Sequence, residues 1–202
     1  MSLTLYGGAR SRATMPRWYL EEKGIPYTWR QLAMENGEHR QPEFLAINPF
    51  GKVPALVDDQ WQSLHGGPLV LFESGAILLH LADCHGQEFT GSPQEAAAKR
   101  ALAAQWILFA NATLAMALFV PSSREKDCAR LLEELNRQLA DGRSLLGGEP
   151  GSWSVADCAV QAYLAYIPMF CPEIDLGPYP HVQATITATQ QRPAYRRVMG
   201  LT

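Results

Sequence analysis

Two short segments of the chain carry residue types suited to holding a small extended peptide. Residues 48–56 read NPFGKVPAL, and residues 72–78 read FESGAIL. Proline lacks an N–H, and only an X-Pro bond takes the cis form at a tolerable free-energy cost, so Val53-Pro54 predicts a sharp bend where a strand begins. An extended ligand can then pair with the backbone of Val53, as a strand added to a sheet edge does. An ordinary turn is the alternative interpretation.

Glu73 and Ser74 supply the charged half of this candidate site. They follow the apolar run 69–72 and open a segment with helical apolar spacing, which places both at a helix N-terminus. The free N–H groups and the dipole there attract a carboxylate, while Glu73 can accept from an ammonium. A zwitterionic α-amino acid head fits both groups. The alternative is that the two residues only cap the helix.

The two segments resemble those of the soluble glutathione transferases, which carry Asn-Pro-x-Gly-x-Val-Pro-x-Leu followed by Glu-Ser-x-Ala-Ile. Residues 37–45 are similar to the phi class and its bacterial relatives. The match is strong over residues 1–80 and moderate beyond. It implies an α/β thioredoxin-like N-terminal domain followed by an all-α helical bundle, a homodimer, and glutathione as a co-substrate without a permanently bound cofactor. The thiol tripeptide is therefore the leading ligand candidate.

The resemblance also implies the contacts with glutathione. Val53, at the bend with Pro54, would pair with the cysteinyl backbone, and Glu73 and Ser74 would hold the γ-glutamyl head. The candidates for the glycine carboxylate all carry a cationic group or an imidazole ring; they are Arg12, His39, Arg40 and Lys52.

A group that ionises the glutathione thiol is also required. A free thiol has a pKa of about 8.5, and lowering it by about two units corresponds to roughly 2.7 kcal/mol. The family uses Ser, Tyr or Cys just after the first strand, so the candidates are Ser11 and Tyr6. The interval to Ser11 is that of the phi class, whereas counting back from residues 20–24 gives Tyr6 the place of the tyrosine in other classes. We favour Ser11, because a residue between strand and helix can point its hydroxyl at the helix mouth.

Arg10 and Arg12 flank Ser11. Their charges can lower the thiol pKa, or Arg12 can take the glycine carboxylate; a solvated loop face is the equal alternative. The second substrate, a small hydrophobic electrophile, is expected in the cleft between the domains. Its candidate wall consists of large side chains at helical spacing, most of which are expected to be core; they are Trp106, Phe109, Met116, Phe119, Tyr163 and Tyr166.

Alternating patterns predict the elements that position these residues. Strands are expected at 3–6, at 27–32, directly after Pro54 and at 69–72, with helices at 13–23, briefly at 41–45, and from Ser74, which gives a mixed sheet with helices packed on it. Residues 58–68 are longer than the hairpin usual in the family. We place the first domain at 1–82, a polar linker at 83–92 and a helical domain at 93–202. A Ser-x-x-Asp capping box at 154–157 opens a nearly apolar helix.

Composition agrees with a soluble, cytoplasmic globular protein. The chain has 202 residues, 47% hydrophobic, and a net charge of −3 without a basic block, which argues against nucleic acid as a partner. No apolar stretch reaches about eighteen uninterrupted residues, so no membrane span is expected. Four cysteines without Cys-x-x-Cys or a nearby histidine cluster argue against a metal site and a dithiol motif; they are Cys84, Cys128, Cys158 and Cys171.

The predicted activity is conjugation of the glutathione thiolate to electrophiles, as in detoxification. One rival is a carrier or scaffold on the same fold that binds without turnover. Another is glutathione-dependent peroxide reduction or isomerisation, which uses the same thiolate on another partner.

Overall fold

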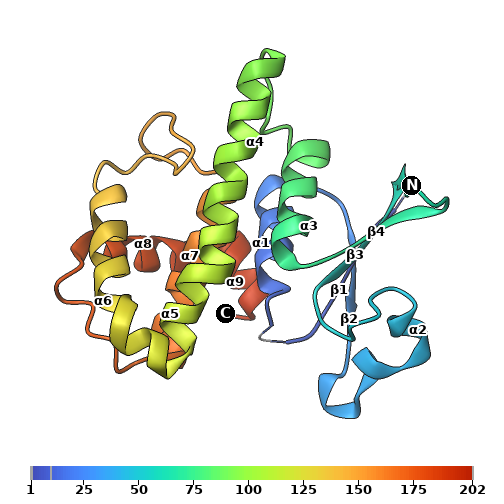
Figure 1. The fold of residues 1–202 in the computed structure, drawn as a ribbon, viewed down its shortest axis with the longest axis horizontal. Coiled ribbons are helices and arrows are strands. Elements are labelled where there is room, and N and C mark those ends of the chain that lie inside the picture. The colour runs from blue at the N-terminus through green and yellow to red at the C-terminus, as the bar shows by residue number, and fades with distance from the viewer. Residues whose placement is uncertain (1, 10, 202) are drawn as a thin grey trace.

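The computed structural model describes residues 2–9 and 11–201, which form a sheet layered with helices beside an all-helical part (Figure 1). The sheet has four strands in the order β2-β1-β3-β4. Their bounds are Leu3–Gly7 for β1, Thr28–Gln31 for β2, Ala55–Gln62 for β3 and Pro68–Phe72 for β4. β1 pairs in parallel with β2 and antiparallel with β3, and β3 pairs antiparallel with β4. The predicted mixed sheet is therefore confirmed.

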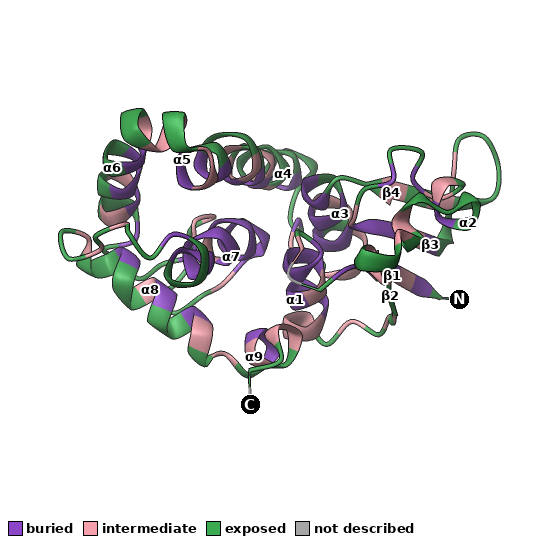
Figure 2. Cartoon of the chain, turned by 90° about the horizontal axis from the view of Figure 1, so that it is seen from below, coloured by how far each residue is buried: buried purple, intermediate pink, exposed green. Residues whose placement is uncertain are grey.

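Helices cover the sheet on both sides. α1 (Thr14–Lys23) connects the two parallel strands, and with α3 (Ser74–His80) it lies between the sheet and the helical part, as Figures 1 and 2 both show. On the opposite side lies the short α2 (Pro42–Leu45). The buried Leu3 and Leu5 alternate with partly exposed neighbours along β1. One face of the sheet thus lies toward α1 and α3, and the other face lies toward α2.

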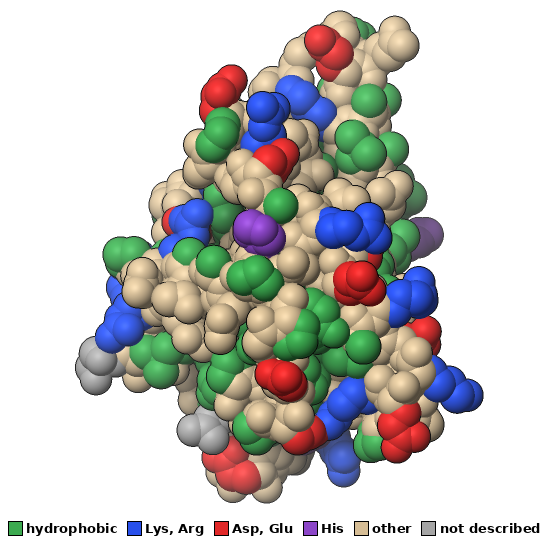
Figure 3. Space-filling view, turned by 90° about the vertical axis from the view of Figure 1, so that its left-hand side faces the viewer, with side chains coloured by type: hydrophobic (Ala, Val, Ile, Leu, Met, Phe, Trp, Pro, Cys, Tyr) green, Lys and Arg blue, Asp and Glu red, His purple; other side chains and the backbone are tan. Residues whose placement is uncertain are grey.

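The segment after residue 93 is helical, as predicted. Its α-helices are α4 (Pro93–Leu108), α5 (Ala115–Phe119), α6 (Pro121–Gln138), α7 (Val155–Phe170), α8 (Pro180–Gln191) and α9 (Pro193–Met199), and a π-helix, η4 (Phe109–Leu114), joins α4 to α5. α7 is buried along most of its length and lies inside the bundle (Figure 2). Acidic and basic side chains lie interspersed over the face of the molecule in Figure 3.

The continuous helical run Pro93–Phe119 is long and apolar enough to cross a membrane by length and composition, and an 18-residue window within it has a mean hydropathy of 1.6. In this fold α4 packs against α3 and α7, so part of its apolar surface faces the core. A core helix of a soluble protein passes the same test. The run therefore carries no argument for a membrane span.

The predicted linker holds the two parts together. Its first residues are still helical, because the π-helix η3 spans Leu81–His85. Further on, Glu88 accepts hydrogen bonds from Tyr19 Oη at 2.9 Å and from the Val155 N–H at 2.9 Å, and it pairs with Lys23 at 2.8 Å. One carboxylate thus ties α1 to the N-terminus of α7.

Replacing Ser154 by alanine is expected to lower the free energy of unfolding by about 1 kcal/mol, because Ser154 forms the capping box of α7 with Asp157. The Ser154 N–H donates to Asp157 Oδ2 at 2.9 Å, and Ser144 Oγ donates to the same oxygen at 2.5 Å. Urea unfolding measures the change, with the exposed Ser122→Ala as the control. An unchanged urea midpoint for Ser154→Ala would contradict the assigned role.

Candidate functional site

A cleft of about 600 Å³ lies where β3 and α3 begin. The Val53-Pro54 peptide bond is cis and stands directly before β3, as the proline pattern indicated. The structure brings six of the eight residues predicted to hold glutathione to this cleft, together with one asparagine and two phenylalanines. The lining residues are Arg12, Asn48, Phe50, Lys52, Val53, Pro54, Phe72, Glu73 and Ser74.

A buried asparagine fixes the loop before the cis bond. Asn48 is 1% exposed, and its Nδ2 donates to the Lys52 carbonyl at 2.7 Å while its Oδ1 accepts from the Phe50 N–H at 3.1 Å. Gly51 has a φ of 57°, and a Cβ there would lie 2.9 Å from the His39 carbonyl oxygen. The loop therefore needs both Asn and Gly. Within residues 2–9 and 11–201, no protein group hydrogen-bonds the backbone of Val53.

The residue before α3 has an unusual backbone. Glu73 has φ 68° and ψ 120°, a region that non-glycine residues rarely adopt, and its exposed side chain makes no capping hydrogen bond. The interpretation of Glu73 as a side-chain cap is therefore wrong. Strained backbone of this kind concentrates at functional sites. The carboxylate stays available at the cleft.

Ser74 is tied to the helical part by a chain of hydrogen bonds. Asn111 Nδ2 donates to Ser74 Oγ at 3.3 Å, and Tyr163 Oη donates to Asn111 Oδ1 at 2.9 Å. Gly75 permits this approach, because a Cβ there would lie 2.7 Å from Ile107 Cγ2. Burial raises the pKa of Tyr163 to about 12, so its hydroxyl remains a neutral donor. Sequence reasoning missed Asn111, whose only signal is a polar side chain in an apolar helix.

The loop before α1 supplies one of the two cations of the cleft. Arg12 lines the cleft, with its Cζ 5.9 Å from the ring centroid of Tyr163. Ser11 Oγ donates to the Gly8 carbonyl at 2.8 Å and accepts from the Ala13 N–H at 3.2 Å. Ser11 therefore stands at the helix mouth, with its proton directed to backbone. The predicted contributor Arg10 lies outside the described residues.

Comparison with known proteins agrees with this geometry. Residues 1–83 match the family model described as glutathione S-transferase, N-terminal domain. The chain is 33% identical over 192 residues to the disulfide-bond oxidoreductase YfcG of Escherichia coli K12, covering 87% of this chain and 84% of that protein. It is 32% identical over 199 residues to the glutathione S-transferase GstB of the same strain, covering 89% and 88%. The chain belongs to the glutathione S-transferase family.

Solved structures place the whole chain in the same architecture. A glutathione transferase of Burkholderia graminis, solved with two glutathione molecules bound per subunit, superimposes with a TM-score of 0.77 at 27% identity, covering 98% of this chain and 87% of that one. The predicted thioredoxin-like domain followed by a helical domain is confirmed. The phi-like subtype stays a prediction.

Tyr6 is not brought to the cleft of this glutathione S-transferase family member. Its ring packs 5.9 Å from that of Phe44 in α2, in a separate hollow that Leu32 and Ile47 also line. Successive side chains of a strand point to opposite faces, and Tyr6 lies on the α2 face. The structure thus corrects the alternative that places the Tyr6 hydroxyl beside the ligand thiol.

His39 and Arg40 are likewise absent from the cleft wall. Both lie in a short 3-10 helix, Glu38–Arg40, behind Gly51, where the Arg40 Cγ would be 3.9 Å from an added Cβ. They flank the loop that carries Lys52. Their contact with the glycine carboxylate stays a prediction.

The six candidates for the electrophile wall separate into two groups. Phe119 and Tyr166 each pack against Tyr163, with ring centroids 6.0 and 6.4 Å apart, and Tyr166 Oη donates to the Ser11 carbonyl at 3.5 Å. Burial raises the pKa of Tyr166 to about 12. This cluster adjoins Arg12 and the loop of Ser11.

The other three candidates do not belong to this aromatic cluster. Trp106 and Phe109 line a groove that Leu131 and Leu135 of α6 complete, and Met116 is 46% exposed on α5. Helical spacing placed all six on apolar faces, but Trp106 of α4 and Phe109 of η4 face α6. The structure therefore corrects the assignment of Trp106 and Phe109 to the electrophile wall, and that of Met116 stays a prediction.

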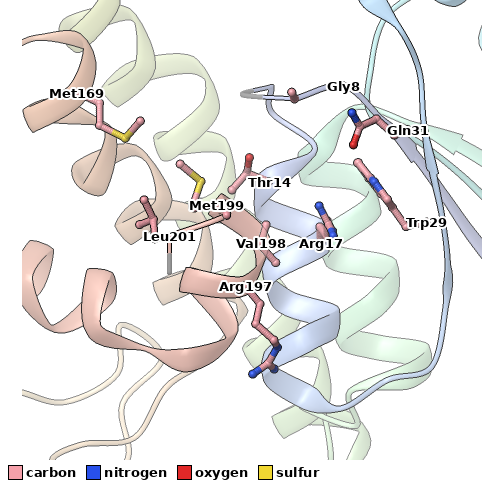
Figure 4. A pocket seen from close by; sticks show the side chains of 12 residues that line it. Gly8, Thr14, Arg17, Trp29, Gln31, Met169, Arg197, Val198, Met199 and Leu201 are labelled. Carbon is pink, nitrogen blue, oxygen red and sulfur yellow. The ribbon is translucent and has the colours of Figure 1, made fainter.

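A second hollow of about 420 Å³ lies between α1, β2 and the C-terminal segment (Figure 4). Its two cations already have partners, because Arg17 lies over the Trp29 ring at 4.4 Å and Arg197 Nε donates to Glu21 Oε2 at 3.2 Å. Met169, Met199 and Leu201 lie on the opposite side. Among the described residues, neither the Val53 backbone nor the Glu73 carboxylate has a hydrogen-bonding partner, so the cleft at Val53 suits a charged peptide better.

Proposed function

We propose that the protein binds glutathione in the cleft at Val53, stabilises its thiolate and conjugates it to small hydrophobic electrophiles. The observation that carries this proposal is the joint placement of an unpaired strand start, a free carboxylate and two cations around one cleft. Glutathione carries an ammonium, two carboxylates and an extended backbone. Glu73 matches the ammonium, Arg12 and Lys52 match the carboxylates, and Val53 matches the backbone.

The bound thiol then lies toward the loop before α1. The Ser11 hydroxyl and the Arg12 guanidinium are the groups that stabilise its thiolate form, since a donor and a cation both favour the charged state. The cluster of Phe119, Tyr163 and Tyr166 forms the apolar wall for the electrophile. No further group is needed, because positioning and charge stabilisation accelerate the attack.

Retention on glutathione-agarose, followed by assays of the eluted protein, tests the proposal. We expect retention, elution by free glutathione, and turnover with an activated aryl halide or an isothiocyanate. Failure to bind the resin, together with no binding heat at millimolar glutathione, would exclude glutathione as a ligand of this protein. Binding without turnover on any electrophile would make the protein a carrier.

Reduction of disulfides with glutathione is the second candidate. It is favoured by the 33% identity to a protein named disulfide-bond oxidoreductase and by the two glutathione molecules in the Burkholderia graminis structure. A small mixed disulfide and a hydroperoxide therefore belong in the same panel. Turnover of either one at a rate well above that of all electrophiles would replace conjugation as the main activity.

We also propose a cytoplasmic homodimer with domains at 1–82 and 93–202 joined by 83–92. An exposed aromatic pair supports the dimer, since Phe50 is 68% and Phe72 39% exposed and their rings lie 5.3 Å apart. Exposed aromatic side chains at the mouth of a cleft favour contact with another protein surface.

A further inference from the structure

Three side chains outside the cleft converge on one point. His80 Nε2 and His85 Nε2 lie 2.8 and 2.6 Å from Asp58 Oδ2. One ligand atom from each residue lies within 4.8 Å of the other two. Across residues 2–9 and 11–201, no other group of three His, Cys, Asp or Glu side chains is arranged in this way. The cysteine and histidine spacing that argued against a metal site did not reveal this cluster.

A π-helix brings the two histidines together. His80 and His85 are five residues apart, and in an α-helix that spacing turns side chains about 140° away from each other. In η3 the Gly86 N–H instead donates to the Leu81 carbonyl at 2.7 Å, a bond across five residues that widens the turn. Both rings then face Asp58. Such π turns inside helices are frequent at functional sites.

The third side chain of the cluster, Asp58, lies in β3. The pairing of β3 with β4 shifts register between Asp58 and Gln62, which breaks the regular ladder at this position. Asp58 Oδ1 accepts from the Gln60 N–H at 3.0 Å, so Oδ2 is the oxygen that faces the two rings. Residues 58–68 do not line the cleft.

Protein surrounds the Asp58 carboxylate, and the two imidazole rings are the part of the cluster that solvent reaches. The Asp58 side chain is 0% exposed, whereas His80 and His85 are 10% and 9% exposed. Trp61 stands edge-on to the His80 ring, with centroids 6.0 Å apart. A carboxylate this deeply buried requires strong donors or a cation.

We infer that Asp58, His80 and His85 form a binding site for a divalent transition metal ion, with Zn²⁺ as the best fit. Zinc takes imidazole nitrogen and carboxylate oxygen at about 2.0–2.2 Å in a tetrahedron, whose ligand atoms are about 3.3 Å apart. The His80 ring moves about 0.5 Å and the His85 ring about 0.7 Å away from the carboxylate to admit the ion. Each imidazole keeps its proton on Nδ1 and presents the Nε2 lone pair, and water fills the fourth position.

The site would lock the two elements that carry the cleft. β3 and α3 both begin at the cleft, next to Pro54 and at Ser74, and both reach the cluster further along. His80 lies six positions after Ser74 in the helix, which is about 9 Å along the axis. The ion therefore acts as a structural clamp. This inference does not depend on the proposed reaction.

Zinc binding to the full chain tests the inference. After treatment with a chelator and dialysis, we expect Zn²⁺ titration by calorimetry to give one ion per chain and a rise in melting temperature. His80→Gln and His85→Gln should each weaken binding at least about 10-fold, because glutamine keeps a donor for Asp58 but replaces the imidazole ligand. Co²⁺ should give the visible absorption of a tetrahedral site.

The exposed histidines His65 and His181 provide matched controls, and His65→Gln and His181→Gln should bind as the parent does. A double variant of His80 and His85 that melts like the metal-free parent is folded and should bind no zinc. Absence of zinc binding by the parent at millimolar Zn²⁺, or binding that survives the double variant, overturns the site. Should the double variant not fold, Asp58→Asn replaces it under the same criteria.

Discussion

Glu73→Gln is expected to weaken glutathione binding about 30-fold while leaving the fold intact. Its carboxylate is exposed at the cleft and unused in capping α3. A hydrogen bond between charged groups contributes about 1.5–3 kcal/mol, which corresponds to roughly 10-fold to 150-fold in affinity. Calorimetry with glutathione measures the loss, and Glu125→Gln, an exposed glutamate on α6, is the matched control.

Glu73→Gly separates binding from stability at the same position. Glycine adopts a positive φ without the penalty that Glu73 bears at 68°, so we expect the free energy of unfolding to rise by about 1 kcal/mol. The same variant should lose affinity at least as much as Glu73→Gln. Tight glutathione binding by Glu73→Gly would show that the carboxylate plays no part, whatever the change in stability.

The N-terminal fold was predictable because its signals are local. Gly24 closes α1 in the left-handed conformation, and Pro54 directly precedes β3, so glycine and proline mark the boundaries of elements whose apolar pattern is clear. The two segments that line the cleft, around Val53 and around Glu73, both lie at such boundaries. Their meeting at one cleft follows from the antiparallel pairing of β3 with β4, which returns Phe72 to the level of Ala55.

The parts that the sequence did not predict depend on contacts between distant elements. Tyr6 lies near the end of the first strand and Ser11 follows that strand, and only the packing of α2 shows that Tyr6 points away from the cleft. Helical spacing did not distinguish Trp106, which faces α6, from Tyr163, which faces Arg12. His80 and His85 would lie on different faces of a regular α-helix, so their convergence requires the π turn.

Ser11→Ala is expected to reduce turnover at pH 6.5 by about 10-fold to 50-fold, because the bound thiol loses a donor that favours its thiolate. Ser11 stands at the mouth of α1 with its hydroxyl donating to the Gly8 carbonyl, so this role requires a change of rotamer that redirects the proton to the ligand sulfur. If its removal returns the thiol pKa from about 6.5 to about 8.5, the thiolate fraction at pH 6.5 falls from one half to about one hundredth.

The pH dependence distinguishes this role from a structural one. Because a thiol with a raised pKa still ionises at high pH, the rates of Ser11→Ala and the parent should converge above about pH 9, and the absorbance of the bound thiolate should titrate at a higher pH.

Arg12→Gln should shift the same titration in the same direction and also weaken glutathione binding, since Arg12 lines the cleft. Tyr6→Phe, whose ring packs on Phe44, should change turnover less than about 2-fold. A pH profile of Ser11→Ala that runs parallel to that of the parent would exclude the hydroxyl as the thiolate donor, and a large loss in Tyr6→Phe would reverse the assignment.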